Sequence, residues 1–194
     1  MLVLGALLAA PAVAETTRTS YTPAQIRAYH ESGRWDRDVA RVFSSARRSL
    51  LRQLDRPRAP RRPAIVLDID ETALSNYPCL DEVDFALTGV ATCVTQSRSV
   101  AIAPARRLVD AARRRKVAVF FITGAPAALA GARRANLRKA GFRGAFTVIG
   151  RPSTSTESSV VPYKSSERRK LERRGSRPCA GSPAARPRAR RARR

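Results

Sequence analysis

Histidine and acidic residues are scarce in this sequence. Its 194 residues include one histidine, and 15 acidic residues stand against 38 lysines and arginines, for a net charge of +23. A single histidine excludes a metal centre built on several imidazoles. The basic excess would suit a nucleic-acid partner, because lysine and arginine displace counterions from phosphate backbones. We favour a solvated helix face for most arginines, which occur in scattered pairs such as Arg106 and Arg107.

Long hydrophobic runs are also missing. The stretch from Leu2 to Ala10 is almost wholly apolar, but it is too short to span a bilayer. Ala12-Val13-Ala14 follows it and has the small-x-small pattern that signal peptidase cuts. No cysteine follows this site to carry a lipoprotein anchor. We therefore predict a signal peptide over residues 1–14, a secreted, periplasmic or cell-envelope location and no stable membrane anchor, with a buried N-terminal helix as the alternative.

Cysteine is rare as well, with three in the chain. Cys79 and Cys93 are close in sequence, and a bridge between them would suit an oxidising compartment. The sequence leaves open whether they pair. Cys179 lies in an arginine-rich C-terminal stretch and is expected to be unpaired.

A hydrophobic fraction of 43% is enough for a core. Thr22-Pro23-Ala24-Gln25 is a capping box that predicts a short helix ending at Gly33. Apolar periodicity predicts a second helix from about Trp35 to Leu54. The apolar run Ala64–Leu67 predicts a strand buried on both faces.

Helices and strands then alternate along the chain. We expect helices over 104–115, 126–141 and 164–174, and strands over 117–122 and 145–149. This order predicts a single α/β domain with a parallel sheet and right-handed crossovers. Residues 74–102 show weak periodicity and are predicted to form an insert or small cap.

Two carboxylates follow the first strand at once, in Asp68-Ile69-Asp70-Glu71-Thr72. Open α/β sheets bind ligands at the carboxyl ends of their strands, so both side chains can reach that crevice. Such a pair can divide the labour of phosphoryl transfer, one attacking phosphorus and the other moving protons. A helix cap or a solvated turn is the alternative for an isolated Asp-x-Asp.

Three segments resemble the motifs of one family. Residues 65–76, IVLDIDETALSN, resemble the first motif of the haloacid dehalogenase (HAD) superfamily, in the form found in its subfamily IIIB acid phosphatases and the plant vegetative storage proteins. Residues 120–126, FFITGAP, resemble the second motif, and residues 163–175, YKSSERRKLERRG, resemble the third. The resemblance covers about Tyr21 to Gly175 and implies a Rossmann-like core with N-terminal helices and a small cap.

The resemblance also implies roles for matching residues. Asp68 would attack the phosphoryl group, and Asp70 would protonate the leaving alcohol and then activate water. Thr123 would hydrogen-bond the phosphoryl oxygens, together with the amides of Gly124 and Ala125 at a helix start. Lys164 would offset the negative charge of nucleophile and phosphate. Alone, Thr123 could be a helix cap and Lys164 a surface lysine.

Mg²⁺ is the cofactor that the resemblance implies, bound by Asp68 and the carbonyl of Asp70. The fourth family motif, which supplies the remaining acid, is missing. No aspartate follows Asp110, and the only acids after Lys164 are Glu167 and Glu172. Its strand is expected to be absent too, which would leave a sheet edge uncovered. We therefore expect weak Mg²⁺ binding, low stability and weak or no activity.

The C-terminal stretch, residues 176–194, contains only Ser, Arg, Pro, Cys, Ala and Gly. We expect it to be a disordered tail after an incomplete domain over residues 15–175. A frameshift in a GC-rich gene is the favoured explanation, and a genuine basic tail is the alternative.

Two functions remain open, and a third is disfavoured. The leading hypothesis is an acid phosphatase acting on small phosphomonoesters, and the alternative is an impaired or inactive binding or storage protein. A specific nucleic-acid binder is not expected, because the tail has no aromatic residue on which bases could stack. His30 is expected on a helix surface, and the substrate, pH optimum and oligomeric state are not indicated.

Overall fold

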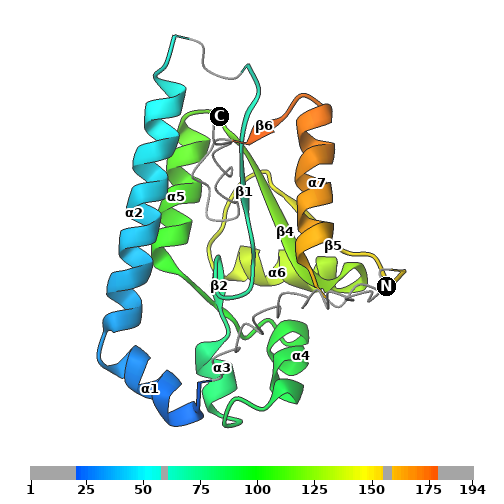
Figure 1. The fold of residues 1–194 in the computed structure, drawn as a ribbon. Helices are drawn as coiled ribbons and strands as arrows, with labels where there is room; N and C mark the ends of the chain where they lie inside the picture. Colours follow the sequence, from blue (N-terminus) through cyan, green and yellow to red (C-terminus); the bar gives the residue numbers. More distant parts are fainter. Residues whose placement is uncertain (1–20, 58–60, 155–158, 179–194) are drawn as a thin grey trace, which may run out of the picture.

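The computed structural model describes residues 21–57, 61–154 and 159–178. Its centre is a four-stranded parallel sheet in the order β5-β4-β1-β6 (Figure 1). The strands are β1 (Pro63–Leu67), β4 (Ala118–Pro126), β5 (Thr147–Arg151) and β6 (Arg177–Pro178). The prediction of an α/β fold with a parallel sheet is confirmed.

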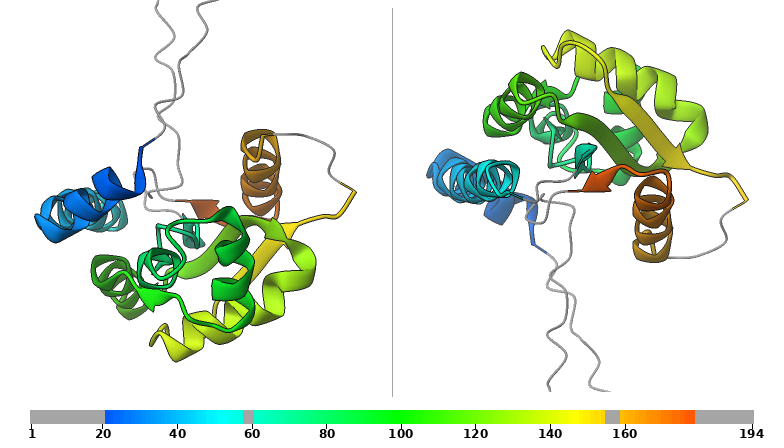
Figure 2. Two further views of the ribbon diagram at one scale, coloured as in Figure 1. Left: turned by 90° about the horizontal axis from the view of Figure 1, so that it is seen from below. Right: turned by 90° about the horizontal axis from the view of Figure 1, so that it is seen from above.

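Helices cover both faces of this sheet. Helices α5 (Ala103–Arg114) and α6 (Ala130–Lys139) lie on one face, and α7 (Val161–Arg173) lies on the other (Figure 2). The long helix α2 (Arg34–Leu54) packs beside α5, and α1 (Pro23–Glu31) precedes it. The predicted capping box is present, because Thr22 accepts a hydrogen bond from the Gln25 amide and the Gln25 side chain accepts one from the Thr22 amide.

Alternation along the strands separates the core into two clusters. Ile65 and Leu67 of β1, with Val119 and Phe121 of β4, face α2, α5 and α6. Val66 and Ile122 face the opposite side and pack against Tyr163 and Leu171 of α7. Strands covered on both faces are uniformly apolar, which explains the continuous hydrophobic run before Asp68.

The predicted insert is a small subdomain at the carboxyl end of β1. It consists of α3 (Tyr77–Asp81) and α4 (Leu87–Thr95) on a stalk made by the antiparallel pair β2 (Leu74–Ser75) and β3 (Val100–Ala101). Cys79 and Cys93 form a disulfide that joins the two helices. Both cysteines are buried, at 4% and 0% exposure. The pairing that the sequence left open is therefore made.

Replacing both disulfide cysteines, Cys79→Ser with Cys93→Ser, should loosen the insert. The bridge closes a sequence separation of 14 residues. A loop of that size contributes about 3 kcal/mol. We expect faster hydrogen–deuterium exchange over residues 77–98 and little change in β1 and β4. Cys179→Ser is the matched control, and equal protection of the insert in both variants would contradict the prediction.

Two sequence predictions about element boundaries are wrong. The stretch expected to be a strandless tail from Ser176 begins with β6, whose two residues pair with Pro63 and Ala64 of β1. The sheet edge beside β1 is thus partly covered. The helix expected to begin at Pro126 begins later, because β4 continues to Pro126, a 3₁₀ turn, η1, spans Ala127–Leu129, and α6 follows.

The position of His30 also differs from the prediction. Its ring stacks between those of Trp35 and Tyr77, with centroid distances of 4.6 Å and 3.7 Å. Burial lowers the pKa of His30, although Asp36 and Asp81 act in the opposite direction. His30 is therefore a packing residue that joins α1 and α2 to the insert, and it is not a solvated surface residue.

The predicted signal peptide, residues 1–14, and residues 179–194 of the predicted tail lie outside the described residues. Within the described ranges, no helix is both long enough and apolar enough to cross a bilayer.

Candidate active site

The four residues predicted to carry the chemistry meet at one end of the sheet. Asp68 and Asp70 follow β1, Thr123 lies near the end of β4, and Lys164 lies in the first turn of α7. Strands β1 and β4 are parallel neighbours, with Leu67 in register with Phe121. Their carboxyl ends therefore open side by side, where α/β sheets bind ligands.

Asp68 is held by contacts on both carboxylate oxygens. Lys164 Nζ lies 2.8 Å from Asp68 Oδ2, and the Ile69 amide donates to Oδ1 at 2.8 Å. The side chains of Asp68 and Lys164 are 26% and 18% exposed. The pair is thus shielded but open to a small solute. A carboxylate fixed beside an ammonium group suits attack on an anionic centre, because the cation offsets the charge that accumulates.

Asp70 is surrounded by hydrogen-bond donors. Its Oδ1 accepts from Asn76 Nδ2 at 2.9 Å and forms an ion pair with Arg133 Nη2. Its Oδ2 accepts from Thr123 Oγ1 at 3.3 Å. The Asp70 side chain is 31% exposed, whereas that of Arg133 is 1% exposed. Burial lowers the pKa of Arg133, and the facing Asp70 opposes that effect.

Behind Asp70 lies a buried polar network that sequence reasoning missed. Ser99 Oγ donates to Asn76 Oδ1 at 2.6 Å, and Asn136 Nδ2 donates to the Ser99 carbonyl at 2.8 Å. Asn76, Ser99 and Asn136 are all at most 4% exposed. Asn76 and Ser99 flank the insert, so the network ties both ends of the insert to α6. One signal was available, because Arg133 and Asn136 are three residues apart on a face that also carries the buried Leu137.

Glu71 shapes the turn after Asp70 and was also missed. It has a left-handed backbone with φ of 50°. Its carboxylate accepts from the Asn76 amide at 2.6 Å and from Ser75 Oγ at 3.2 Å. Burial raises the pKa of Glu71. These two hydrogen bonds close the loop that carries Asp70.

The expectation that Gly124 and Ala125 begin a helix is wrong, since both belong to β4. The Ala125 amide donates to Thr123 Oγ1 at 3.1 Å, so Thr123 orders its own loop and touches Asp70. A Cβ on Gly124 would lie 2.9 Å from a Val160 methyl, just before α7. The glycine thus allows the chain that carries Lys164 to approach β4 closely.

The sequence from residue 9 to residue 177 matches the family model of the HAD superfamily, subfamily IIIB (acid phosphatase). The chain belongs to this subfamily. The family prediction made from the three motifs is therefore confirmed.

Solved structures show the same fold. A class C acid phosphatase from Bacillus anthracis is 18% identical, with a TM-score of 0.60 over 80% of this chain and 66% of that one. The tungstate-bound structure of the class C acid phosphatase from Bacillus anthracis is 17% identical, with a TM-score of 0.57 over 72% of this chain and 60% of that one. This subfamily IIIB chain thus spans less than two thirds of either protein. No curated protein matches it.

A divalent cation is general in the HAD superfamily, and the donors in this subfamily IIIB chain suit a hard ion in kind. The Asp68 carboxylate and the Asp70 carbonyl are oxygen donors of the kind that such an ion prefers. Their number is low, because the described residues contain no cluster of three or more His, Cys, Asp or Glu side chains that could hold a metal.

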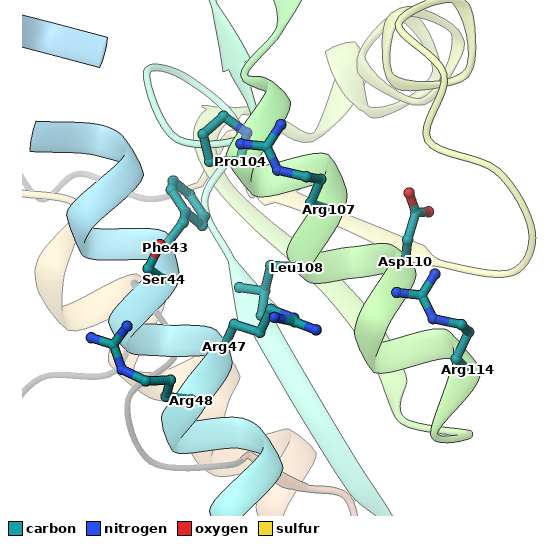
Figure 3. Close-up of a pocket in the computed structure, with 9 residues that line it drawn as sticks. All are labelled: Phe43, Ser44, Arg47, Arg48, Pro104, Arg107, Leu108, Asp110 and Arg114. Atoms are coloured by element: carbon teal, nitrogen blue, oxygen red, sulfur yellow. The ribbon is translucent and has the colours of Figure 1, made fainter. Parts of the chain in front are cut away.

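A separate hollow of about 600 Å³ lies between α2 and α5 (Figure 3). Its lining includes four arginines, Arg47, Arg48, Arg107 and Arg114. None of the four forms an ion pair with another described residue. The hollow contains neither of the two site aspartates, nor Thr123 or Lys164, so it lacks the groups needed for phosphoryl transfer.

Proposed function

We propose that this chain is a phosphomonoester hydrolase that acts through an aspartyl-phosphate on Asp68. The observation that carries the proposal is the 2.8 Å contact of Lys164 with Asp68, beside Asp70 and Thr123. Four residues from three separate sequence segments meet there with a nucleophile, a proton carrier and two donors for an anion.

In the first step an Asp68 carboxylate oxygen attacks phosphorus. The bond from phosphorus to the ester oxygen breaks, and Asp70 gives its proton to the departing alkoxide, which leaves as an alcohol. In the second step water attacks the phosphorus of the acyl phosphate. Asp70 takes a proton from that water, the acyl–phosphate bond breaks, and Asp68 and inorganic phosphate are released.

Thr123 and Lys164 hold the phosphoryl oxygens in both steps. The hydroxyl of Thr123, which donates to Asp70 Oδ2 in the substrate-free chain, would turn its one proton toward a phosphoryl oxygen. The Lys164 ammonium would balance charge shared by Asp68 and the phosphoryl group. Bound Mg²⁺ would add charge neutralisation and orient the reacting groups. Asp68 and the Asp70 carbonyl would hold it, and the small number of protein ligands leads us to expect weak binding and slow turnover.

We also propose an oxidising location, either outside the cell or in the cell envelope. The Cys79–Cys93 disulfide supports it, because such bridges persist in oxidising compartments and are rare in the cytosol.

The test of the proposed activity is phosphate release from p-nitrophenyl phosphate by the purified chain. We expect slow release that needs millimolar Mg²⁺, on the order of the concentrations at which weak sites fill, and that chelator removes. Fast release at micromolar Mg²⁺ would contradict the expected weak site. Binding of inorganic phosphate with no hydrolysis at any Mg²⁺ concentration would favour the binding or storage alternative.

A further inference from the structure

Arg133 occupies an unusual place in the molecule. It lies on the sheet-facing side of α6, with a side chain that is 1% exposed. Among the residues that the structure describes, its one hydrogen-bond partner is Asp70, which Nη2 contacts. The Nε and Nη1 atoms are buried with no hydrogen-bond partner among the described residues.

This arrangement is expensive for the fold. A buried guanidinium group loses its hydration, and two of its nitrogens recover no hydrogen bond in exchange. An apolar side chain of similar volume would avoid both losses, and buried ion pairs replaced in this way often leave stability equal or higher. The stability of the fold therefore does not explain a buried arginine at position 133. Its hydrogen bond with Asp70 suggests that it acts on the Asp70 carboxylate instead.

Asp70 needs orienting more than Asp68 does. It has to face the ester oxygen in one step and a water in the next, and its side chain is 31% exposed at the mouth of the site. Thr123 holds Oδ2 through one long bond of 3.3 Å. Asn76 and Arg133 hold Oδ1 from the buried side. Oδ1 has two donors on the buried side, whereas Oδ2 has one long contact with Thr123, so Oδ2 is the freer oxygen to exchange a proton.

We propose that Arg133 is a positioning residue that fixes the Asp70 carboxylate for proton transfer to the leaving group, an inference that rests on the proposed function. Arg133 itself touches neither substrate nor phosphorus. Its guanidinium anchors Oδ1 while Oδ2 passes its proton to the departing alkoxide. α6 thereby becomes part of the active-site scaffold, through one residue that none of the three motifs contains.

The decisive measurement is the dependence of rate on the leaving group. Phenolate is a poor leaving group and needs a proton, whereas p-nitrophenolate leaves readily without one. In Arg133→Met we expect kcat/KM on phenyl phosphate to fall by about 10- to 100-fold. This is part of the roughly 10²- to 10⁴-fold acceleration that a well-positioned general acid supplies. On p-nitrophenyl phosphate the fall should be below about threefold.

Arg133→Lys and Arg134→Met are the companion variants. Lysine keeps the charge and the one donor that Arg133 uses, so it should restore most of the rate on phenyl phosphate. Arg134 is the exposed neighbour, which donates to the Phe146 carbonyl at 3.2 Å and does not contact Asp70. Its methionine variant should match the wild type on both esters. Equal losses on both esters in Arg133→Met, or no rescue by lysine, would overturn the proposal.

Absence of hydrolysis of every ester would refute the proposed function. The positioning role of Arg133 can still be tested in that case, by a structural measurement. Crystal structures of the wild type and Arg133→Met should differ at Asp70, with its carboxylate turned away from Thr123 in the variant. The unfolding midpoint of Arg133→Met should equal or exceed that of the wild type. An unmoved Asp70 would overturn the positioning role, and a large drop in the midpoint would show that Arg133 serves the fold.

Discussion

Asp68→Asn should remove phosphomonoester hydrolysis to the background of the assay, a loss on the order of 10³-fold or more, since loss of an attacking group removes the covalent route. The amide keeps the size of the side chain but lacks the negative oxygen that attacks phosphorus. It also loses the ion pair with Lys164, whose Nζ lies 2.8 Å from Oδ2 in the wild type.

The measurement has two parts, because the wild-type rate is itself expected to be low. Phosphate release is followed with excess p-nitrophenyl phosphate, and acid-quenched samples are analysed by mass spectrometry for a phosphorylated peptide that contains Asp68. The wild type should show both signals and Asp68→Asn neither. Asp36→Asn, in the exposed first turn of α2, is the matched control and should retain both. Hydrolysis that persists in Asp68→Asn would exclude Asp68 as the nucleophile.

Phe121→Ala should bring the domain close to unfolding. Phe121 lies in β4 with 0% exposure and makes edge-to-face contacts with Phe142 and Phe146, at centroid distances of 5.7 Å and 5.3 Å. Removing a fully buried ring leaves a cavity and costs about 3–5 kcal/mol. Domains of this kind are stable by about 5–15 kcal/mol in total, so the loss is a large share.

Urea unfolding followed by circular dichroism checks this prediction. The midpoint for Phe121→Ala should fall well below that of the wild type, with a similar slope. Tyr21→Ala provides the contrast, because Tyr21 is 68% exposed and its loss should change stability by no more than about 0.5 kcal/mol. A Phe121→Ala midpoint equal to that of Tyr21→Ala would mean that the three rings do not form the core described.

The end of the domain after Lys164 decides how many acidic residues could join Asp68 as ligands of a cation. Within the described residues, strand β6 supplies two residues beside β1. The acids after Lys164 are Glu167 and Glu172, both in α7. Glu167 forms an ion pair with Lys170 on the same helix at 2.6 Å, so it is engaged there. Slow turnover and weak cation binding therefore belong to the proposed function, and the Mg²⁺ dependence of phosphate release tests them.

Local patterns in the sequence determined much of this protein. The capping box at Thr22, the apolar run before Asp68 and the periodicity of α2 each depend on residues within a few positions of one another. Asp68 and Asp70 could be placed at a strand end from the sequence, whereas Thr123 and Lys164 were assigned to the same site only because their segments resemble the second and third motifs of the family. Parallel pairing of β1 and β4 brings the ends that carry Asp68, Asp70 and Thr123 together, and the packing of α7 adds Lys164.

Tertiary structure decided the rest, because it depends on residues that are far apart in the chain. The Arg133–Asp70 pair spans 63 positions, and the bond from Asn136 to the Ser99 carbonyl spans 37. A buried arginine and a surface arginine look alike in a sequence that contains many, and burial separates Arg133 from Arg134. The later start of α6 and the strand β6 were likewise set by packing and pairing between segments, which override local preference at the ends of elements.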